Sequence, residues 1–251
     1  MDAIERLREG YLGGALETLQ NEVRKAPQEA KHRVFLFQLL SARGDWDRAL
    51  TQLRICGQLD PKALAMAQTY REAIGCEFVR DRVIRGETAP LVFGEPQSWI
   101  ALLIEALGAL GRGNAEAAAD LRAKAFEEAP AVSGTANGTP FQWIADADMR
   151  FGPGVELIMN GRYYWAPFSA IRRIQLEEPA DLRDRVWTPG EVTWANGGQA
   201  PALIPTRYPG ADTFPRDSLK LARETDWADL GAETWAGLGQ RIFATDVEDF
   251  A

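Results

Sequence analysis

The sequence predicts an α+β protein, in which an N-terminal helical-repeat domain over residues 1–130 precedes a β-rich domain over residues 131–251. The first half repeats a pattern of glycine, alanine, leucine and proline at an interval of 34 residues. Residue usage changes beyond Pro130, where nine of the 14 prolines and six of the eight tryptophans lie. With 46% hydrophobic and 25% charged residues, a chain of 251 residues has enough apolar material for two ordinary domains.

The repeat has the period of a tetratricopeptide unit, which is a pair of antiparallel helices. Two such helices cross closely only where a small side chain separates their backbones, and we expect Ala49 to lie there. Gly44 then begins the turn, and Pro61 begins the next helix, where a missing N–H costs nothing. A weaker third copy lies 69 residues beyond the second. The matching positions are Gly10, Gly44 and Gly113; Ala15, Ala49 and Ala118; Leu16 and Leu50; Leu19 and Leu53; and Pro27, Pro61 and Pro130.

The chain between the second and third copies is predicted to contain one helix over residues 62–86. Residues 90–96 follow as a loop, because prolines and a glycine surround a short apolar run there. We expect the apolar residues of this loop to pack against the helices.

Short strands and tight turns are predicted for the second half. Asn160-Gly161 separates two apolar runs and tolerates the positive φ angles of a type I′ hairpin turn. A second hairpin is predicted around Asn196-Gly197-Gly198. Either a small barrel-like sheet or an open antiparallel sheet accommodates these strands. The last residues, 246–250, are predicted to form a frayed acidic tail.

Charge and composition exclude several classes of function. The net charge of −8, most of it from the second half, repels nucleic acids and anionic lipid surfaces. No run of 18 apolar residues predicts a membrane span, and acids stand where a signal peptide carries its basic start. Two distant cysteines favour a reducing compartment over a disulfide scaffold. We therefore expect a cytoplasmic protein that binds neither nucleic acid nor membranes.

Catalytic signatures are scarce. His32 is the sole histidine, which excludes multi-histidine metal sites, and no G-x-S-x-G motif accompanies it. Asp146 and Asp148 lie two residues apart, so both carboxylates share one face if the segment is a strand. Paired acids there could bind a cation or act as acid and base. The alternative interpretation is a solvated sheet edge. We predict no enzyme and no cofactor.

Several motifs of the second half resemble the ImpE family, also called TagJ or SciE. They are NGRYYWAPF (160–168), IRRI (171–174), PADLRD (179–184), PTRYPG (205–210), TDW (225–227) and GLGQR (237–241). The resemblance implies a non-enzymatic accessory protein of bacterial type VI secretion with a helical first half. It further implies binding to the N-terminal helix of the small sheath subunit and, through it, an influence on the AAA+ ATPase that recycles the sheath.

Stacked helical hairpins form a groove suited to an amphipathic helix. Repeat register predicts the positions that line this groove in the second and third copies, although those in the third copy could instead be simply buried. They are Lys31, Val34, Gln38 and Ser41, then Ile100, Leu103 and Leu107. Two other functions stay open: an acid-based hydrolase or metal-binding domain at Asp146 and Asp148, and a repeat scaffold in another assembly.

Overall fold

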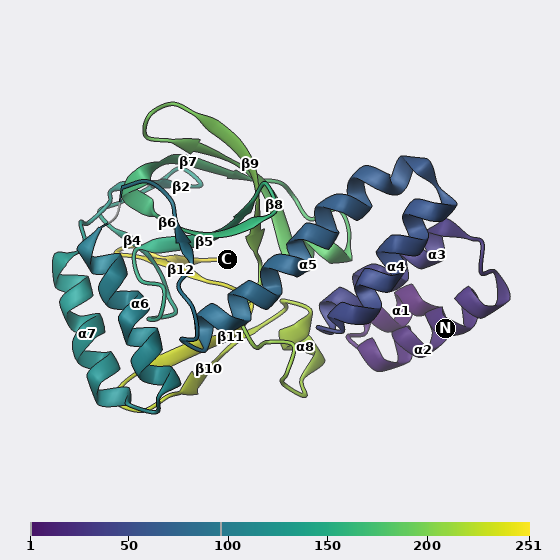
Figure 1. Cartoon of the computed structure of the whole chain (residues 1–251), viewed down its shortest axis with the longest axis horizontal. Coiled ribbons are helices and arrows are strands. Elements are labelled where there is room, and N and C mark those ends of the chain that lie inside the picture. The colour runs from purple at the N-terminus through teal and green to yellow at the C-terminus, as the bar shows by residue number, and fades with distance from the viewer. Residues whose placement is uncertain (1, 96) are drawn as a thin grey trace.

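The computed structural model describes residues 2–95 and 97–251 and confirms the α+β class. Helices make up most of the first half, and short strands most of the second (Figure 1). Pro96, at the end of the predicted loop, lies outside the described residues.

Consecutive helices of the first half pack as hairpins, α1 with α2, α3 with α4, and α6 with α7. The long α5 crosses the molecule from the first two hairpins to the third (Figure 1), as predicted for residues 62–86. The elements are α1 (Ala3–Arg8), α2 (Leu12–Lys25), α3 (Ala30–Ala42), α4 (Trp46–Leu59), a 3-10 turn (Pro61–Ala63), α5 (Leu64–Ile84), α6 (Ser98–Gly111) and α7 (Ala115–Glu128).

The repeated glycines end the first helix of each hairpin. Gly10, Gly44 and Gly113 have φ angles of +85°, +74° and +76°, the left-handed region that favours glycine. In each hairpin the glycine N–H and the next N–H donate to carbonyl oxygens of the last helical turn, with the same spacing in all three. This is the Schellman motif, which satisfies carbonyls left free at a helix end.

The repeated alanines are buried within their hairpins. Ala15, Ala49 and Ala118 are all completely buried, as expected for small residues between closely packed helices. The three copies are therefore structurally equivalent. Their assignment to the tetratricopeptide class remains an interpretation of the sequence period.

The second half is built around an open six-stranded sheet with the order β1-β6-β5-β9-β8-β7. Smaller sheets pair β10 with β11, β2 with β3, and β4, β12 and β13 with one another. The elements are β1 (Leu91–Val92), β2 (Gly134–Ala136), β3 (Thr139–Phe141), β4 (Ile144–Asp146), β5 (Gly154–Met159), β6 (Arg162–Pro167), β7 (Ile171–Leu176), β8 (Trp187–Trp194), β9 (Gln199–Pro205), α8 (Asp217–Lys220), β10 (Thr225–Asp229), β11 (Trp235–Gly239), β12 (Phe243–Thr245) and β13 (Asp249–Phe250), with 3-10 turns at Phe168–Ala170 and Leu182–Arg185.

Both predicted hairpins are confirmed. Asn160 and Gly161 connect β5 to β6 with φ angles of +50° and +69°, the signs that a type I′ turn requires. The turn at residues 195–198 connects β8 to β9, which pair along most of their length.

Two predictions about loops are wrong. Leu91 and Val92 form β1, which pairs in parallel with Tyr164 and Trp165 of β6, so this segment joins the sheet rather than only the helices. The predicted frayed tail is also ordered, because Phe250 pairs with Phe243 in an added strand. In both cases a long-range partner provides hydrogen bonds that the local sequence does not reveal.

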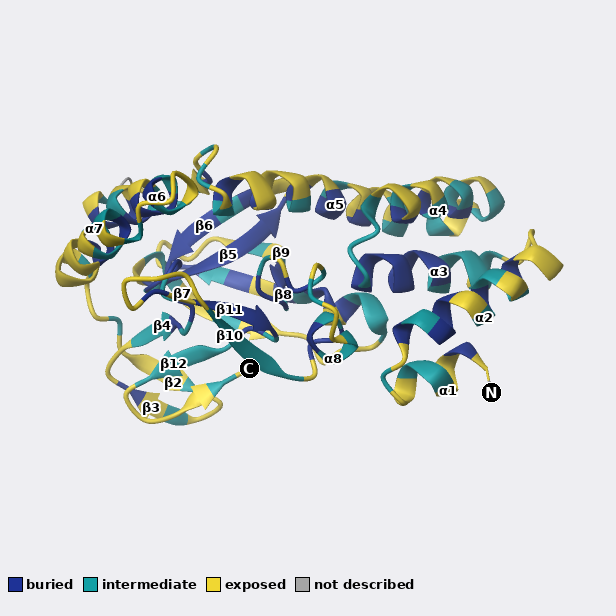
Figure 2. Ribbon diagram, turned by 90° about the horizontal axis from the view of Figure 1, so that it is seen from below, coloured by how far each residue is buried: buried dark blue, intermediate teal, exposed yellow. Residues whose placement is uncertain are grey.

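One large apolar core joins the helices to the sheet. It contains residues of α2, α3, α5 and α6 together with Trp165 and Trp187 of the strands. Figure 2 shows α5 lying along one side of the whole molecule, with its exposed face outward and β5 and β6 beneath it. The domain boundary at residue 130 remains a prediction.

Enlarging the alanine at a helix crossing tests the repeat register. Ala49→Leu adds a branched side chain where Ala49 has no exposed surface, and overpacking of this kind costs roughly 1–3 kcal/mol. We expect urea denaturation to show a free energy of unfolding lowered by that amount.

Ala65→Leu is the matched control, because Ala65 lies exposed on α5 and the same change there adds no buried volume. Equal stability of the two variants would contradict the predicted crossing.

Candidate functional site

An open groove of about 580 Å³ lies between α1, α3 and the turn before α5. Its lining contains apolar residues, among them Ala3, Val34 and Phe35, which we call the floor, and charged residues, which we call the rim. The residues that line it are Asp2, Ala3, Ile4, Glu22, Ala30, Lys31, His32, Val34, Phe35, Gln38, Asp60 and Ala63. A cavity of this size lies within the range of ligand and peptide sites.

Three of the seven predicted groove residues, Lys31, Val34 and Gln38, line this groove. Ser41 does not, because it is completely buried on α3 and donates its hydroxyl hydrogen to the carbonyl oxygen of Phe37. Gln38 is itself largely buried, although it contributes to the lining.

The predicted positions on α6 are not part of the groove. Ile100, Leu103 and Leu107 are 2%, 1% and 1% exposed, which corrects their placement on a binding surface and confirms the alternative that they are core residues. The physical reason is α5, whose 21 residues separate the third hairpin from the first two (Figure 1). The seven residues therefore do not form one continuous surface.

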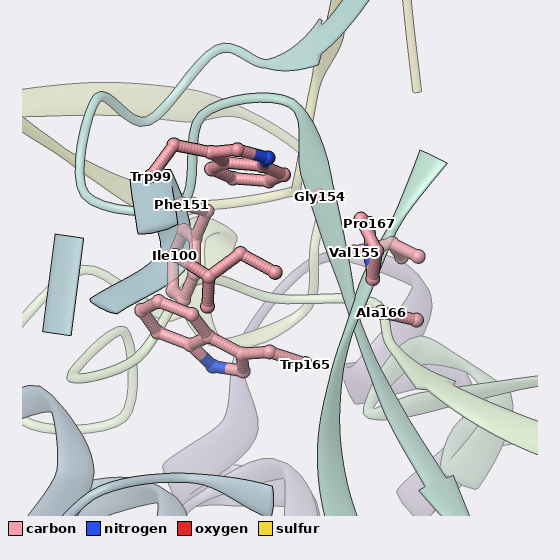
Figure 3. Close-up of a pocket in the computed structure, with 8 residues that line it drawn as sticks. All are labelled: Trp99, Ile100, Phe151, Gly154, Val155, Trp165, Ala166 and Pro167. Atoms are coloured by element: carbon pink, nitrogen blue, oxygen red, sulfur yellow. The ribbon is translucent and has the colours of Figure 1, made fainter. Parts of the chain in front are cut away.

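Ile100 instead borders a small cavity where α6 meets β5 and β6 (Figure 3). The cavity has a volume of about 10 Å³ and an almost wholly apolar lining, including Trp99, Phe151 and Trp165. That volume is about the minimum for one water molecule. This position is a packing defect of the core and offers no ligand site.

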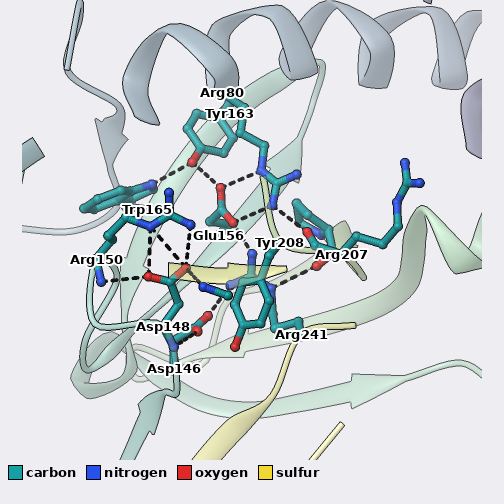
Figure 4. Close-up of polar contacts among 12 residues, drawn as sticks. Arg80, Asp146, Asp148, Arg150, Glu156, Tyr163, Trp165, Arg207, Tyr208 and Arg241 are labelled. Atoms are coloured by element: carbon teal, nitrogen blue, oxygen red, sulfur yellow. Dashed lines mark hydrogen bonds and ion pairs between the residues drawn. The ribbon is translucent and has the colours of Figure 1, made fainter. Parts of the chain in front are cut away.

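A cluster of charged side chains lies in the interior between α5 and the sheet (Figure 4). Glu156 on β5 is completely buried. Arg80 on α5 binds its carboxylate with two hydrogen bonds, Nε to Oε1 at 2.7 Å and Nη2 to Oε2 at 2.8 Å. Arg241 and the hydroxyl of Tyr163 bind the same carboxylate. Arg80 also donates to the carbonyl oxygen of Arg207 at 2.7 Å.

Asp146 and Asp148 belong to the same interior rather than to a solvated edge, so that interpretation is wrong. Asp146 pairs with Arg241, and Asp148 pairs with Arg150 at 2.5 Å. Asp148 also accepts the backbone N–H of Gly237 at 2.8 Å. Arginines and backbone N–H groups thus occupy the oxygens that a metal ion or a substrate would need. Among the described residues, no group of three or more His, Cys, Asp or Glu is placed to hold a metal ion.

The cluster joins four carboxylates to three guanidinium groups: Glu77, Asp146, Asp148 and Glu156, with Arg80, Arg150 and Arg241. Burial alone would raise the pKa of Glu156, but Arg80 and Arg241 outweigh it and lower the pKa to about 2. Burial raises the pKa of Asp146 to about 7, although Arg241 acts in the opposite direction. These shifts follow from packing and ion pairing and do not themselves identify a reaction centre.

One feature of the sequence indicates this cluster, although no prediction drew on it. Glu156 interrupts an apolar strand whose six residues are all buried. A charge in such a strand requires a cation, because an unpaired buried carboxylate is very costly. The pattern does not indicate which arginines provide it, since Arg80 and Arg241 lie 76 and 85 residues away.

A second set of contacts fixes the helical hairpins to the sheet half. Arg207 donates to the carbonyl oxygens of Ser41 and Ala42 at the C-terminus of α3. Arg223 donates in the same way at the end of α1, to Leu7 and Arg8. Positive charges at helix C-termini are favourable because the helix dipole is negative there.

A carboxylate of the second half caps the N-terminus of a helix in the first half. Asp217 accepts the backbone N–H of Leu12, the first residue of α2, at 2.9 Å. This is capping across 205 residues of sequence, and it satisfies a donor that an isolated helix leaves free. One segment of the second half, residues 207–223, therefore caps three helices of the first.

The chain is similar to known proteins along its full length. It is 48% identical over 251 residues to the type VI secretion system accessory component TagJ of Pseudomonas aeruginosa, covering 100% of this chain and 88% of that protein. The model of the ImpE protein family matches residues 138–251. The chain belongs to the ImpE family.

A solved structure shares the fold of this ImpE family member. Protein VPA1032 from Vibrio parahaemolyticus superimposes with a TM-score of 0.90 at 27% sequence identity, covering 99% of this chain and 93% of that one. The helical half and the sheet half thus recur together in one arrangement. In the described part of this ImpE protein, no helix is both long and apolar enough to cross a membrane.

Neutralising the central carboxylate tests the buried cluster. Glu156→Gln leaves Arg80 and Arg241 without their shared counter-ion, and breaking a buried pair costs roughly 3–5 kcal/mol at neutral pH. The folded-state pKa of about 2 lies below the ordinary value of 4.5. The stabilisation is therefore present above pH 4.5 and is lost as the pH falls towards 2. Urea denaturation should show the gap between wild type and variant closing over that interval.

Asp226→Asn is the control, because Asp226 pairs with Arg216 on the surface and water screens such a pair. It should change stability little at any pH. A Glu156→Gln protein as stable as wild type at pH 7 would show that the cluster is not needed for the fold.

Proposed function

We propose that this chain is a non-enzymatic accessory component of bacterial type VI secretion, acting in the cytoplasm as an adaptor. The observation that carries the proposal is the 48% identity to TagJ, which extends over the whole chain and not over one domain only. Two proteins with this level of sequence identity can share a binding surface that is formed by several helices or strands.

We propose as its partner the small subunit of the contractile sheath, whose N-terminal helix would lie in the groove between α1 and α3. Through this subunit the chain would influence the AAA+ ATPase that recycles the sheath. The dimensions of the groove support a helix as its occupant. A helix with its side chains is about 10–12 Å wide and rises about 5.4 Å per turn. The groove volume of 580 Å³ therefore equals about the volume of one full helical turn, or of two turns that enter the groove to half their width.

The chemistry of the interior supports an adaptor over a hydrolase. Asp146 and Asp148 were the acids that could have formed a catalytic or metal-binding pair, and each is held by an arginine. The remaining alternative to a secretion adaptor is a repeat scaffold in a different assembly, which would have the same fold but another partner.

A carboxylate in the groove floor should abolish capture of the sheath subunit. Val34→Asp places a charge where an apolar helix face would pack, and Val34 is only partly buried in the free protein, so the fold tolerates it. We expect capture of the purified small sheath subunit to fall at least about tenfold, as measured by pull-down and by titration.

Val79→Asp is the matched control, since Val79 is 42% exposed on α5 and lies outside the groove. Removing the N-terminal helix of the sheath subunit should also prevent capture by the wild-type chain. If the wild-type chain recovers components of another assembly and no sheath subunit, the secretion role is wrong.

A further inference from the structure

The charges around the groove are unequal. Among its described lining residues, three carboxylates, Asp2, Glu22 and Asp60, stand against one lysine, Lys31. His32 is the other ionisable side chain of this lining, and its Nδ1 lies 3.6 Å from Glu22. The rim is therefore acidic while the floor is apolar.

Two of these carboxylates are fixed in place by backbone hydrogen bonds. Asp2 caps α1 by accepting the N–H of Glu5 at 2.8 Å, and Asp60 caps the 3-10 turn by accepting the N–H of Lys62 at 2.9 Å. A backbone N–H orients a carboxylate without cancelling its charge. Both acids therefore present an ordered negative charge to whatever enters the groove.

The walls of the groove select the shape of its occupant. They are formed by α1, α2, α3 and the turn before α5, with no strand among the described lining residues. An extended peptide that binds by strand addition needs a free strand edge for its backbone hydrogen bonds, whereas a helix satisfies its own backbone and needs only an apolar surface. An apolar floor between helices thus favours a helix.

We propose that this groove selects an amphipathic helix whose apolar stripe is flanked by lysine or arginine. This inference rests on the proposed function, because it specifies the chemistry of the partner at the same site. Basic flanks pair with Asp2, Glu22 and Asp60, and acidic flanks are repelled by the rim and by the net charge of −8. Rim charges of this kind contribute chiefly to partner choice and to the rate of association.

Two synthetic helical peptides test the proposal on the full-length chain. They share one apolar stripe and differ only in flanking residues, lysine in one and glutamate in the other, and binding is followed by fluorescence anisotropy. We expect the lysine peptide to bind at least about tenfold more tightly in low salt. The preference should shrink as salt is raised, because exposed charges are screened.

Removing acidic charge from the rim and adding it should change the affinity for the lysine peptide in opposite directions. Glu22→Gln with Asp60→Asn keeps the size of both side chains and leaves an acceptor for the Lys62 N–H, and it should weaken binding of the lysine peptide about threefold to tenfold. Lys31→Glu should strengthen the same binding. Glu116→Gln with Asp120→Asn, on the exposed face of α7, changes the net charge equally and should have little effect.

The outcomes separate this inference from the proposed function. Equal binding of both peptides, or equal effects of the rim and α7 variants, would overturn the charge selection. Capture of the sheath subunit that is lost in Val34→Asp but unchanged in the rim variants would overturn it too, while leaving the adaptor function in place. Selective binding of the lysine peptide without capture of the sheath subunit would support the groove chemistry and reject that partner.

Discussion

Glu156 places a carboxylate in the middle of a strand that is buried along its whole length, and the arrangement of the molecule follows from its need for cations. Arg80 reaches it from α5, and Arg241 from the connection between β11 and β12. The first contact fixes the long helix against the sheet, and the second fixes the C-terminal strands. A cluster of this kind adds little stability over an apolar core of the same volume. It is intolerant of misplacement, however, because each partner left alone would be a buried charge.

Charges also connect the two halves at the helix ends. Arg207, Asp217 and Arg223 cap three helices of the first half from one segment of the second. Hairpins attached in this way cannot shift against the sheet without losing these hydrogen bonds. The groove lies elsewhere on α1 and α3, and residues of the first half alone line it. The fold thus provides a support for this surface and pairs the carboxylates of its buried cluster with arginines.

The sequence predicted the features that depend on local geometry. Glycines that must be left-handed, such as Gly44, and alanines that must be small, such as Ala49, recur at a fixed interval and could be recognised without a structure. Asn160-Gly161 identified its hairpin for the same reason. Features that depend on distant partners were not predictable. The surroundings of Asp146 are set by Arg241, 95 residues away, and the repeat period did not reveal that α5 separates the predicted groove positions of α6 from those of α3.

Mutual dependence of the two halves is the central claim, and hydrogen exchange under increasing urea, followed by mass spectrometry, tests it most directly. Amides of α3 and of β5 report on the helical half and the sheet half respectively. If the buried cluster and the caps join the halves into one cooperative unit, both sets should lose protection at the same urea concentration and with the same dependence on it. Loss of protection in α2, α3 and α4 well before β5, β8 and β9 would contradict that dependence.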